Sequence, residues 1–194
     1  KARAILGDSM AQTRLALMYY YGLGVKKDFT KAAKWYRKSA DQGWKVAQHN
    51  IGYMYANGLG VEQDFKEAVQ WYQKAADQGL ASAQYSLGLA YYDGQGVQQD
   101  FKEAVTWYRK AANQGDAKAQ YKLGVMYDNG EGVLEDNVTA YAWWNIAAAN
   151  GSKSAKDNKP KIAKNIIPEQ IAKAEDLLIE MIKKNPKLIK KKQN

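Results

Sequence analysis

The feature that most constrains this chain is a nine-residue segment that recurs every 36 residues. Its copies are YGLGVKKDF from Tyr21, NGLGVEQDF from Asn57, DGQGVQQDF from Asp93 and NGEGVLEDN from Asn129. Self-similarity at a period of roughly 20–50 residues is typical of solenoids and other repeat arrays, so the period takes precedence over any local pattern. The glycine pair in each copy has two possible meanings. It is either a phosphate-binding loop used four times or the turn of a repeated structural unit.

Other positions repeat with the same step. In the second unit they are occupied by Ala47, Gln48, Tyr55, Trp71 and Gly79, and the same residue types stand 36 residues before and after each of them. A residue type that recurs identically in every unit is expected to serve the fold, so we interpret the tryptophan column as core.

Each unit is predicted to form two helices. In the second unit Ala47, Ile51, Met54 and Tyr55 follow the spacing i, i+4, i+7 and i+8, which places them on one face of a helix, and residues 68–76 repeat that pattern. No segment shows sustained alternation with a period of two, so no strands are expected. The sequence therefore predicts an all-α chain of four 36-residue helical hairpins.

The glycine pair is best explained as a turn in this fold. Gly58 follows the first helix at the position where a left-handed residue is favoured, and Asp64 is placed to cap the second helix, with Glu67 three residues later completing a capping box. A phosphate-binding loop would need a preceding strand and a following Lys-Ser/Thr pair, and the sequence has neither.

The repeated pattern A.Q..LG..Y..G.GV..D...A..WY.KAA.QG resembles the Sel-1-like repeat family, which is related to tetratricopeptide repeats. The resemblance implies a right-handed α/α superhelix, or solenoid, of four hairpins with a C-terminal capping helix. The fourth copy departs from the pattern at Asn137, Trp144 and Asn145. The four predicted repeats span residues 7–42, 43–78, 79–114 and 115–151.

The two ends of the chain fall outside these four repeats. Residues 1–6 align with residues 37–42, so we interpret them as the end of a preceding repeat helix. Residues 152–186 are predicted to form a linker and the capping helix, which begins near Pro168 because proline suits the first turn of a helix. Residues 187–194 are predicted to be a basic tail that can be deleted from Lys187 at little cost.

The net charge of +9 does not indicate nucleic-acid binding. Residues 152–194 contain 12 lysines and 5 acidic residues, a balance of +7, whereas residues 1–151 contain 17 basic and 15 acidic residues, a balance of only +2. A nucleic-acid reader needs basic residues along its working face. No apolar run approaches the ~20 residues that span a bilayer, so no integral membrane segment is expected.

The sequence offers few residues for catalysis. It has one histidine, His49, no cysteine and no Ser-x-x-Lys motif, which a β-lactamase-like hydrolase would need. We therefore predict that the protein is not an enzyme and has no cofactor or metal site. A hydrolase remains the alternative of a different class, and it would require acidic or nucleophilic groups that converge on one surface.

The first helix of each hairpin is expected to line a concave groove, by analogy with tetratricopeptide repeats. The groove-facing residues of the first unit would be Met10, Thr13, Leu17, Tyr20 and Tyr21. Tyrosine suits recognition because it combines a large contact area with a hydroxyl group. The alternative is that several tyrosines pack between repeats and that His49 is an ordinary groove residue. The predicted partner-binding residues are Tyr20, His49, Tyr53, Asn57, Tyr85, Leu89, Tyr92, Tyr121 and Asp128.

The resemblance implies a non-enzymatic scaffold or adaptor that binds a protein or peptide in this groove. A second possibility within binding is an immunity protein that neutralises a secreted bacterial toxin. The resemblance also implies a bacterial protein of the periplasm or the secreted fraction, with the cytoplasm as the alternative. We expect a monomer.

Overall fold

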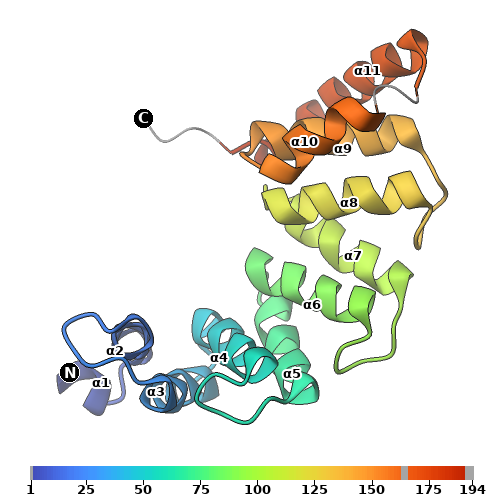
Figure 1. Cartoon of the computed structure of the whole chain (residues 1–194). Helices are drawn as coiled ribbons and strands as arrows, with labels where there is room; N and C mark the ends of the chain where they lie inside the picture. The colour runs from blue at the N-terminus through green and yellow to red at the C-terminus, as the bar shows by residue number, and fades with distance from the viewer. Residues whose placement is uncertain (1, 163–165, 191–194) are drawn as a thin grey trace. The chain divides into compact units, whose positions relative to one another are not determined.

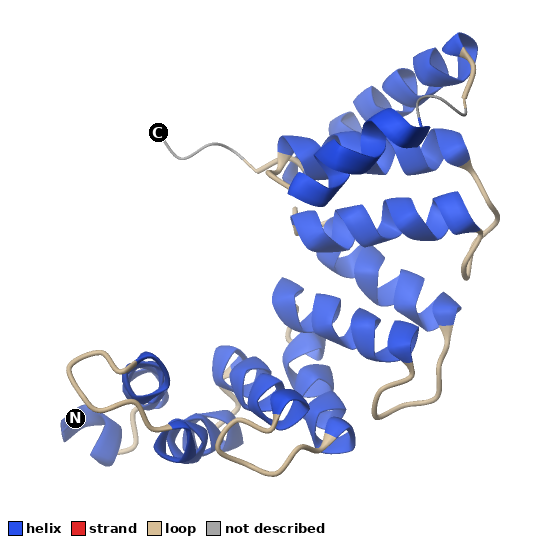
Figure 2. Cartoon of the chain, in the orientation of Figure 1, coloured by secondary structure: helices blue, strands red, loops and turns tan. Residues whose placement is uncertain are grey.

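The described part of the chain consists of helices and contains no strand (Figure 1, Figure 2). The computed structural model describes residues 2–162 and 166–190. The predicted all-α fold class is thus confirmed. The helices, with η1 a short 3-10 helix, are α1 (Ala2–Ile5), α2 (Ser9–Tyr21), α3 (Phe29–Asp41), α4 (Lys45–Asn57), α5 (Phe65–Asp77), α6 (Ala81–Asp93), α7 (Phe101–Ala112), α8 (Ala117–Asn129), α9 (Asn137–Ala149), α10 (Lys153–Ile162), α11 (Pro168–Lys184) and η1 (Pro186–Leu188).

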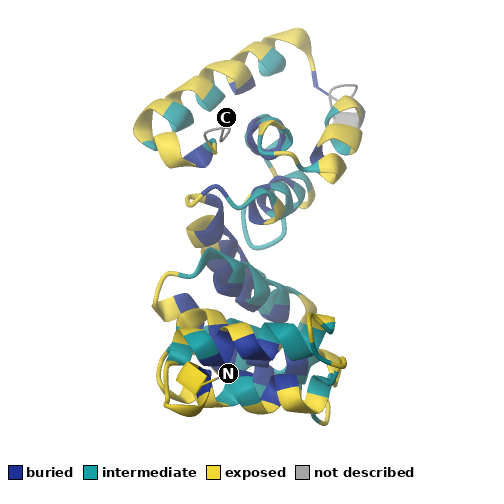
Figure 3. Ribbon diagram, turned by 90° about the vertical axis from the view of Figure 1, so that its left-hand side faces the viewer, coloured by how far each residue is buried: buried dark blue, intermediate teal, exposed yellow. Residues whose placement is uncertain are grey.

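The chain folds as two compact units, residues 1–99 and residues 100–194. The first unit holds the hairpins α2–α3 and α4–α5, followed by α6, and the second holds α7, the hairpin α8–α9 and the C-terminal elements. Within each unit the second helix of one hairpin packs against the first helix of the next, as α3 does on α4 and α7 on α8. The buried residues lie on the sides of the helices that face one another (Figure 3).

The first glycine of each repeated pair ends a helix. Gly58 has a φ of +62° and donates its backbone N–H to Tyr55, and the N–H of Leu59 donates to the carbonyl of Met54 at 2.9 Å. These bonds satisfy carbonyls at the end of α4 that have no partner within the helix. Glycine takes this left-handed conformation without strain. The interpretation of the pair as a turn is confirmed here.

In the second, third and fourth pairs the second glycine is needed for a further reason. A Cβ atom on Gly60 would lie 2.2 Å from the carbonyl carbon of Phe29 and 2.5 Å from the nitrogen of Thr30. The loop of the second hairpin thus presses directly on the backbone at the start of α3. Gly96 approaches Phe65 in the same way. The loops that carry Gly60, Gly96 and Gly132 therefore press on the start of the preceding second helix, and only glycine leaves room for that contact, whereas Gly24 of the first loop meets no backbone in this way.

The aspartate caps form as predicted, but the capping box does not. The Asp64 carboxylate accepts from the N–H of Glu67 at 3.0 Å. The N–H of Asp64, which a capping box would give to Glu67, donates instead to the carbonyl of Tyr55. The Glu67 carboxylate is free to accept from Arg37 at 3.2 Å and from the indole of Trp71 at 3.0 Å. Because Arg37 lies on α3, Glu67 links two hairpins rather than closing its own helix.

A buried glutamine on each first helix joins three segments. The side-chain amide of Gln48 donates to the carbonyl of Ala40, at the end of the preceding hairpin, at 3.3 Å. Its oxygen accepts from Gln78, at the end of its own hairpin, at 2.8 Å. Burying an amide is costly unless it is hydrogen-bonded, so this pairing explains why the Ala-Gln column recurs. The same donation to an alanine carbonyl is made by Gln12, Gln84 and Gln120.

The aromatic columns form the core together with small residues that let helices approach. Trp71, Trp107 and Trp143 are buried, as predicted, whereas Trp35 is only partly buried. A Cβ atom on Gly52 would lie 2.9 Å from the ring of Tyr72, so glycine at this position admits the tyrosine of the neighbouring helix.

After the fourth hairpin, α10 continues the repeat register. It begins at Lys153, one period after Ala117 begins α8, and its Ala155 is fully buried like Ala119 on α8. The polar, lysine-rich segment is therefore helical through Ile162. Helix α11 begins at Pro168 and packs on α9, as α10 does. Two helices thus cover α9.

The residues after α11 are not a dispensable tail. Leu188 is 3% exposed, and its carbonyl oxygen accepts from Gln120 at 2.8 Å and from Asn150 at 2.6 Å. Asn185 donates to the carbonyl of Asn113, and the N–H of Lys190 donates to Asn150. The expectation that the chain tolerates deletion from Lys187 does not fit these contacts, because the deletion would remove a buried side chain and the acceptor of one buried and one half-buried amide. Residues 191–194 lie outside the described residues.

Candidate binding surface

Charge is distributed unequally between the two helices of each hairpin in the first unit. Among the 39 residues of α2, α4 and α6 the only charged side chains are Arg14, Lys45 and Asp93. The 26 residues of α3 and α5 carry nine charged side chains, five on α3 and four on α5. The first helices therefore present a nearly uncharged face.

Three tyrosines lie on this face, two at the C-terminal end of α2 and one in α4. We call Tyr20, Tyr21 and Tyr53 the tyrosine cluster. The rings of Tyr20 and Tyr21 meet edge to face with their centroids 4.8 Å apart, and Tyr20 meets Phe29 in the same way at 5.2 Å. Tyr21 is 63% exposed and Tyr53 is 44% exposed. Tyr21 is thus held against Tyr20 while much of its surface stays in water.

The hydroxyls of the cluster come close together. Burial raises the pKa of Tyr20, and the neighbouring hydroxyl of Tyr53 raises it further. Because Tyr20 lies on α2 and Tyr53 on α4, the contact joins two hairpins. The raised pKa keeps Tyr20 protonated and neutral at physiological pH.

A buried layer supports the cluster from below. Burial raises the pKa of Tyr36 and of Tyr72 above its ordinary value. The side chains of Asn50 and Ser86, on the first helix of the next hairpin in each case, neighbour these hydroxyls and partly offset the rise in pKa. The layer fixes α4 and α6 against the second helices behind them, and it adds no charge to the face.

His49 packs between hairpins. Its Nε2 lies 3.3 Å from the hydroxyl of Ser86 on α6, and its ring centroid lies 5.6 Å from that of Tyr72. Burial lowers the pKa of the imidazole, so the ring is neutral at physiological pH. These contacts suit packing between repeats, a role that the sequence suggested for some of the tyrosines, whereas His49 was expected to be a groove residue.

The remaining predicted residues of the first unit differ in exposure. Asn57 is exposed and donates its side-chain amide to the carbonyl of Tyr53 at 2.7 Å, one turn earlier on α4. Tyr85, Leu89 and Tyr92 are half-buried on α6. Asn57 thus borders the tyrosine cluster.

Thr13 was expected to face the groove, but it does not. It is 5% exposed, and its hydroxyl lies 2.8 Å from that of Ser39 on α3. A threonine hydroxyl is small enough to enter the contact between two helices, where it finds a polar partner. The predicted groove-facing columns therefore include one position that packs inside the hairpin.

In the second unit Tyr121 and Asp128 lie in different surroundings. The ring of Tyr121 stacks on that of Trp144 with centroids 6.2 Å apart, and its hydroxyl accepts from Asn158 on α10 at 2.7 Å. Helices α9 and α10 therefore hold it on both sides. Burial raises the pKa of the Asp128 carboxyl, and the neighbouring Glu135 raises it further. We do not include either residue in the tyrosine cluster.

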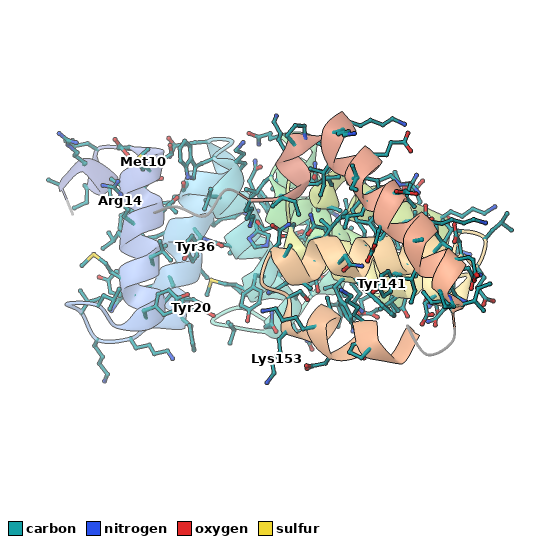
Figure 4. All side chains as sticks on the ribbon, turned by 90° about the horizontal axis from the view of Figure 1, so that it is seen from above. Met10, Arg14, Tyr20, Tyr36, Tyr141 and Lys153 are labelled. Carbon is teal, nitrogen blue, oxygen red and sulfur yellow. The ribbon has the colours of Figure 1, made fainter. Side chains whose placement is uncertain are left out.

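Two exposed apolar residues extend the uncharged face beyond the cluster. Met10 on α2 is 45% exposed and Val46, one period later on α4, is 37% exposed. Figure 4 shows Met10, Arg14 and Tyr20 along α2. Arg14 was not selected from the sequence, although it is the single charge of its helix and could have been found that way.

The described residues form neither a metal site nor a membrane-spanning helix. Within residues 2–162 and 166–190, no group of three or more histidine, cysteine or acidic side chains is arranged to hold a metal ion. The described helices also include none that is long and apolar enough to cross a membrane.

Comparison with known families and structures identifies similar proteins. The Sel1 repeat family model matches residues 9–44, 45–80, 81–116 and 117–152. A Sel1 repeat protein from Oxalobacter formigenes is 34% identical in sequence, with a TM-score of 0.77, and the match covers 96% of this chain and 76% of that one. A protective antigen with an SLR fold, present in uropathogenic Escherichia coli strains, is 32% identical, with a TM-score of 0.63 over 98% of this chain and 50% of that one.

One curated relative matches this chain over a much shorter segment. It is a Sel1-like repeat-containing protein of Acanthamoeba polyphaga mimivirus, 57% identical over 42 residues, which are 22% of this chain. The match spans only 7% of the length of that relative. It therefore concerns a little more than one repeat.

Proposed function

Because this chain belongs to the Sel1 repeat family, whose repeats usually mediate protein interactions, we propose that it is a non-enzymatic binding module. Its working surface is the nearly uncharged face of α2 and α4, centred on the tyrosine cluster. The partner is a protein that presents a peptide segment or loop to this face.

The observation that supports this proposal most directly is the exposure of tyrosines that other contacts already hold in place. Tyr21 and Tyr53 keep 63% and 44% of their surface exposed although the ring of Tyr21 packs against Tyr20 and the hydroxyl of Tyr53 neighbours that of Tyr20. Ordering a flexible side chain on binding costs roughly 0.5–1.5 kcal/mol, so an aromatic side chain that is already fixed retains more of its contact energy. Tyrosine is also enriched among the residues that dominate binding interfaces.

The periodic core residues explain why the exposed tyrosines of this face are not needed for folding. The buried tyrosines, the tryptophans and the glutamines satisfy the contacts between helices, and they recur with the period of 36 residues. The positions of Tyr21 and Tyr53 instead change residue type between units: Tyr21 aligns with Asn57 and Asp93, and Tyr53 aligns with Leu17 and Leu89. Such variation is expected of residues that contact a partner.

The test is selection of binders from a displayed library of random peptides of about ten residues, using the full chain as bait. An extended chain covers ~3.3 Å per residue, so this length spans several helices packed ~8–10 Å apart. The double variant Tyr21→Ala, Tyr53→Ala should weaken binding of the selected peptides by about 2–4 kcal/mol and leave helical circular dichroism unchanged.

Leu134→Ala is the matched control, because Leu134 is a large apolar residue in the second unit and is 90% exposed. It should leave the affinity unchanged. If the tyrosine variant binds the peptides as well as the unmodified chain does, the face of α2 and α4 is not the binding surface.

A further inference from the structure

Resting on the proposed function, the loop that joins α2 to α3 indicates which kind of partner segment the tyrosine cluster binds. We call residues 22–28 the first loop; its Lys26 and Lys27 are exposed. The ammonium of Lys27 lies 4.6 Å from the ring centroid of Phe29, and that centroid lies 5.2 Å from the ring centroid of Tyr20. Positive charge therefore stands one phenylalanine ring away from the cluster.

This part of the first repeat is basic, whereas the matching parts of the other three repeats are acidic. Residues 19–31 carry three lysines and one aspartate, a net charge of +2. Residues 55–67 and 91–103 each carry one lysine and three acidic residues, a net charge of −2. Residues 127–139 carry four acidic residues and no basic one, a net charge of −4. Because the same hairpin forms with either sign, its fold does not require the lysines.

Lysine at position 27 also replaces a residue that closes the turn in other loops. The side-chain amide of Gln63 donates to the carbonyl of Ala56 at 2.8 Å, and that of Gln99 donates to the carbonyl of Tyr92 at 2.8 Å. The Lys27 ammonium lies against an aromatic ring instead. The first loop thus places a charge beside the cluster where two other loops place a turn contact.

The lysines can still receive an anion. Within residues 2–162 and 166–190, no carboxylate lies within ion-pair distance of Lys26 or Lys27. Lys31 pairs with Asp28 at 3.1 Å, but these side chains are 58% and 31% exposed, and a pair so open to water contributes little. A carboxylate brought by a partner would therefore meet these cations without breaking a buried ion pair.

The next loop limits how far that anion can extend. Gly60 presses on the backbone at Phe29, so the loop after α4 borders the first one. Its Glu62 is exposed, and its segment carries the net charge of −2. A long polyanion laid across both loops would meet acidic residues on the second. The charge pattern fits one or two carboxylates on a short protein segment.

We propose that the tyrosine cluster and the first loop together bind a short acidic segment of the protein partner. An apolar or aromatic side chain of the segment packs on Tyr21 and Tyr53, and an Asp or Glu two or three residues away lies against Lys26 and Lys27. In an extended chain that spacing covers about 7–10 Å, which is enough to pass one intervening ring.

The test uses the peptides selected from the random library on the full chain. Asp or Glu should be enriched two or three positions from an apolar or aromatic residue. The dissociation constant should rise about 3–10-fold between about 50 mM and 500 mM NaCl, because exposed ion pairs are screened. Lys26→Gln with Lys27→Gln should weaken binding by a similar factor and remove most of the salt dependence. This variant should fold, because Gln98 and Gln99 occupy the same positions in the third repeat.

Lys173→Gln with Lys183→Gln is the matched control. It makes the same change in net charge at two exposed lysines of α11, in the second unit, and should leave the affinity unchanged. Replacing the acidic residue of the peptide by its amide should weaken binding to the unmodified chain. On Lys26→Gln with Lys27→Gln it should have almost no effect, because the two changes remove the same contact.

Several outcomes would overturn the acidic segment. Peptides without Asp or Glu, bound equally well by the lysine variant but lost in Tyr21→Ala with Tyr53→Ala, would do so and keep the tyrosine face. Competition by an oligothymidylate of about ten nucleotides would replace the protein segment by a polyanion. Self-association of the chain that the lysine variant abolishes would assign the acidic residues to a second copy. Binding that survives the tyrosine variant would instead overturn the proposed function itself.

Discussion

At the scale of single residues, Gly58 and Gly60 of the second loop have different roles, which substitution should separate. A Cβ on Gly58 would touch only Gln63, at 3.4 Å, so Gly58→Ala should cost mainly the left-handed conformation, about 1–2 kcal/mol. Gly60→Ala adds a Cβ within 2.5 Å of the backbone of α3 and should cost more, about 2–5 kcal/mol. Urea unfolding of both variants measures the difference. Equal losses would show that the backbone contact is not needed.

His49 gives a second prediction at this scale, because it is the only histidine of the chain. Burial lowers its pKa in the folded state, so below the unfolded value of about 6.5 the unfolded chain binds the proton more readily. The histidine therefore costs no stability above that pH and destabilises the fold progressively below it. The unfolding midpoint should fall more between pH 7.5 and pH 5.5 in the unmodified chain than in His49→Gln. The same fall in both chains would assign the pH dependence to the carboxylates.

At the scale of elements, the C-terminal segment after α11 should act as part of the second unit. Leu188→Ala removes a side chain that is 97% buried and should cost about 2–5 kcal/mol. Lys187→Ala is the control, because its side chain is exposed and one residue away; it should be nearly neutral. Thermal unfolding followed by circular dichroism compares the two. A neutral Leu188→Ala would mean that residues 186–190 do not support α9 and the turn at Asn150.

The elements also show what the sequence could and could not predict. The helices, their aspartate caps and the first glycine follow from local spacing and backbone preference, so the period predicts them well. Gly60, the glutamine pairing and the link from Glu67 to Arg37 depend on contacts between hairpins, which no single-helix pattern contains. The docking of Leu188 was missed because KLIKKKQN has the composition of a solvated basic tail, and only the tertiary contacts reveal that Leu188 is buried.

The residues of the candidate surface also include some that the sequence predicted correctly and some that it did not. Tyr20 and Tyr53 were predicted from the variable columns of the first helices, and they do come together. Thr13 shows the limit of that reasoning, because a column that varies in type can still point into the hairpin when the side chain is small. Tyr121 shows a second limit, because the elements that follow the last hairpin cover it.

At the scale of the whole molecule, stability and binding should be separable between the two units. Tyr21 and Tyr53 lie in residues 1–99, whereas Leu188 and its partners Gln120 and Asn150 lie in residues 100–194. In repeat proteins stability is approximately a sum of local terms and contacts between neighbours, so damage at one end need not reach the other. Leu188→Ala should therefore lower the unfolding temperature and leave the affinity for the selected peptides unchanged.

The double variant Tyr21→Ala, Tyr53→Ala should lower the affinity for the peptides and leave the unfolding temperature nearly unchanged. Both side chains are exposed, so their removal mainly deletes contacts with the peptide. The comparison is made below the first unfolding transition, with affinity and circular dichroism measured on the same samples. If Leu188→Ala weakens peptide binding as much as the tyrosine variant while its helicity is intact, the peptide must engage both units. The binding surface would then have to include residues 100–194, and the assignment of recognition to α2 and α4 alone would be wrong.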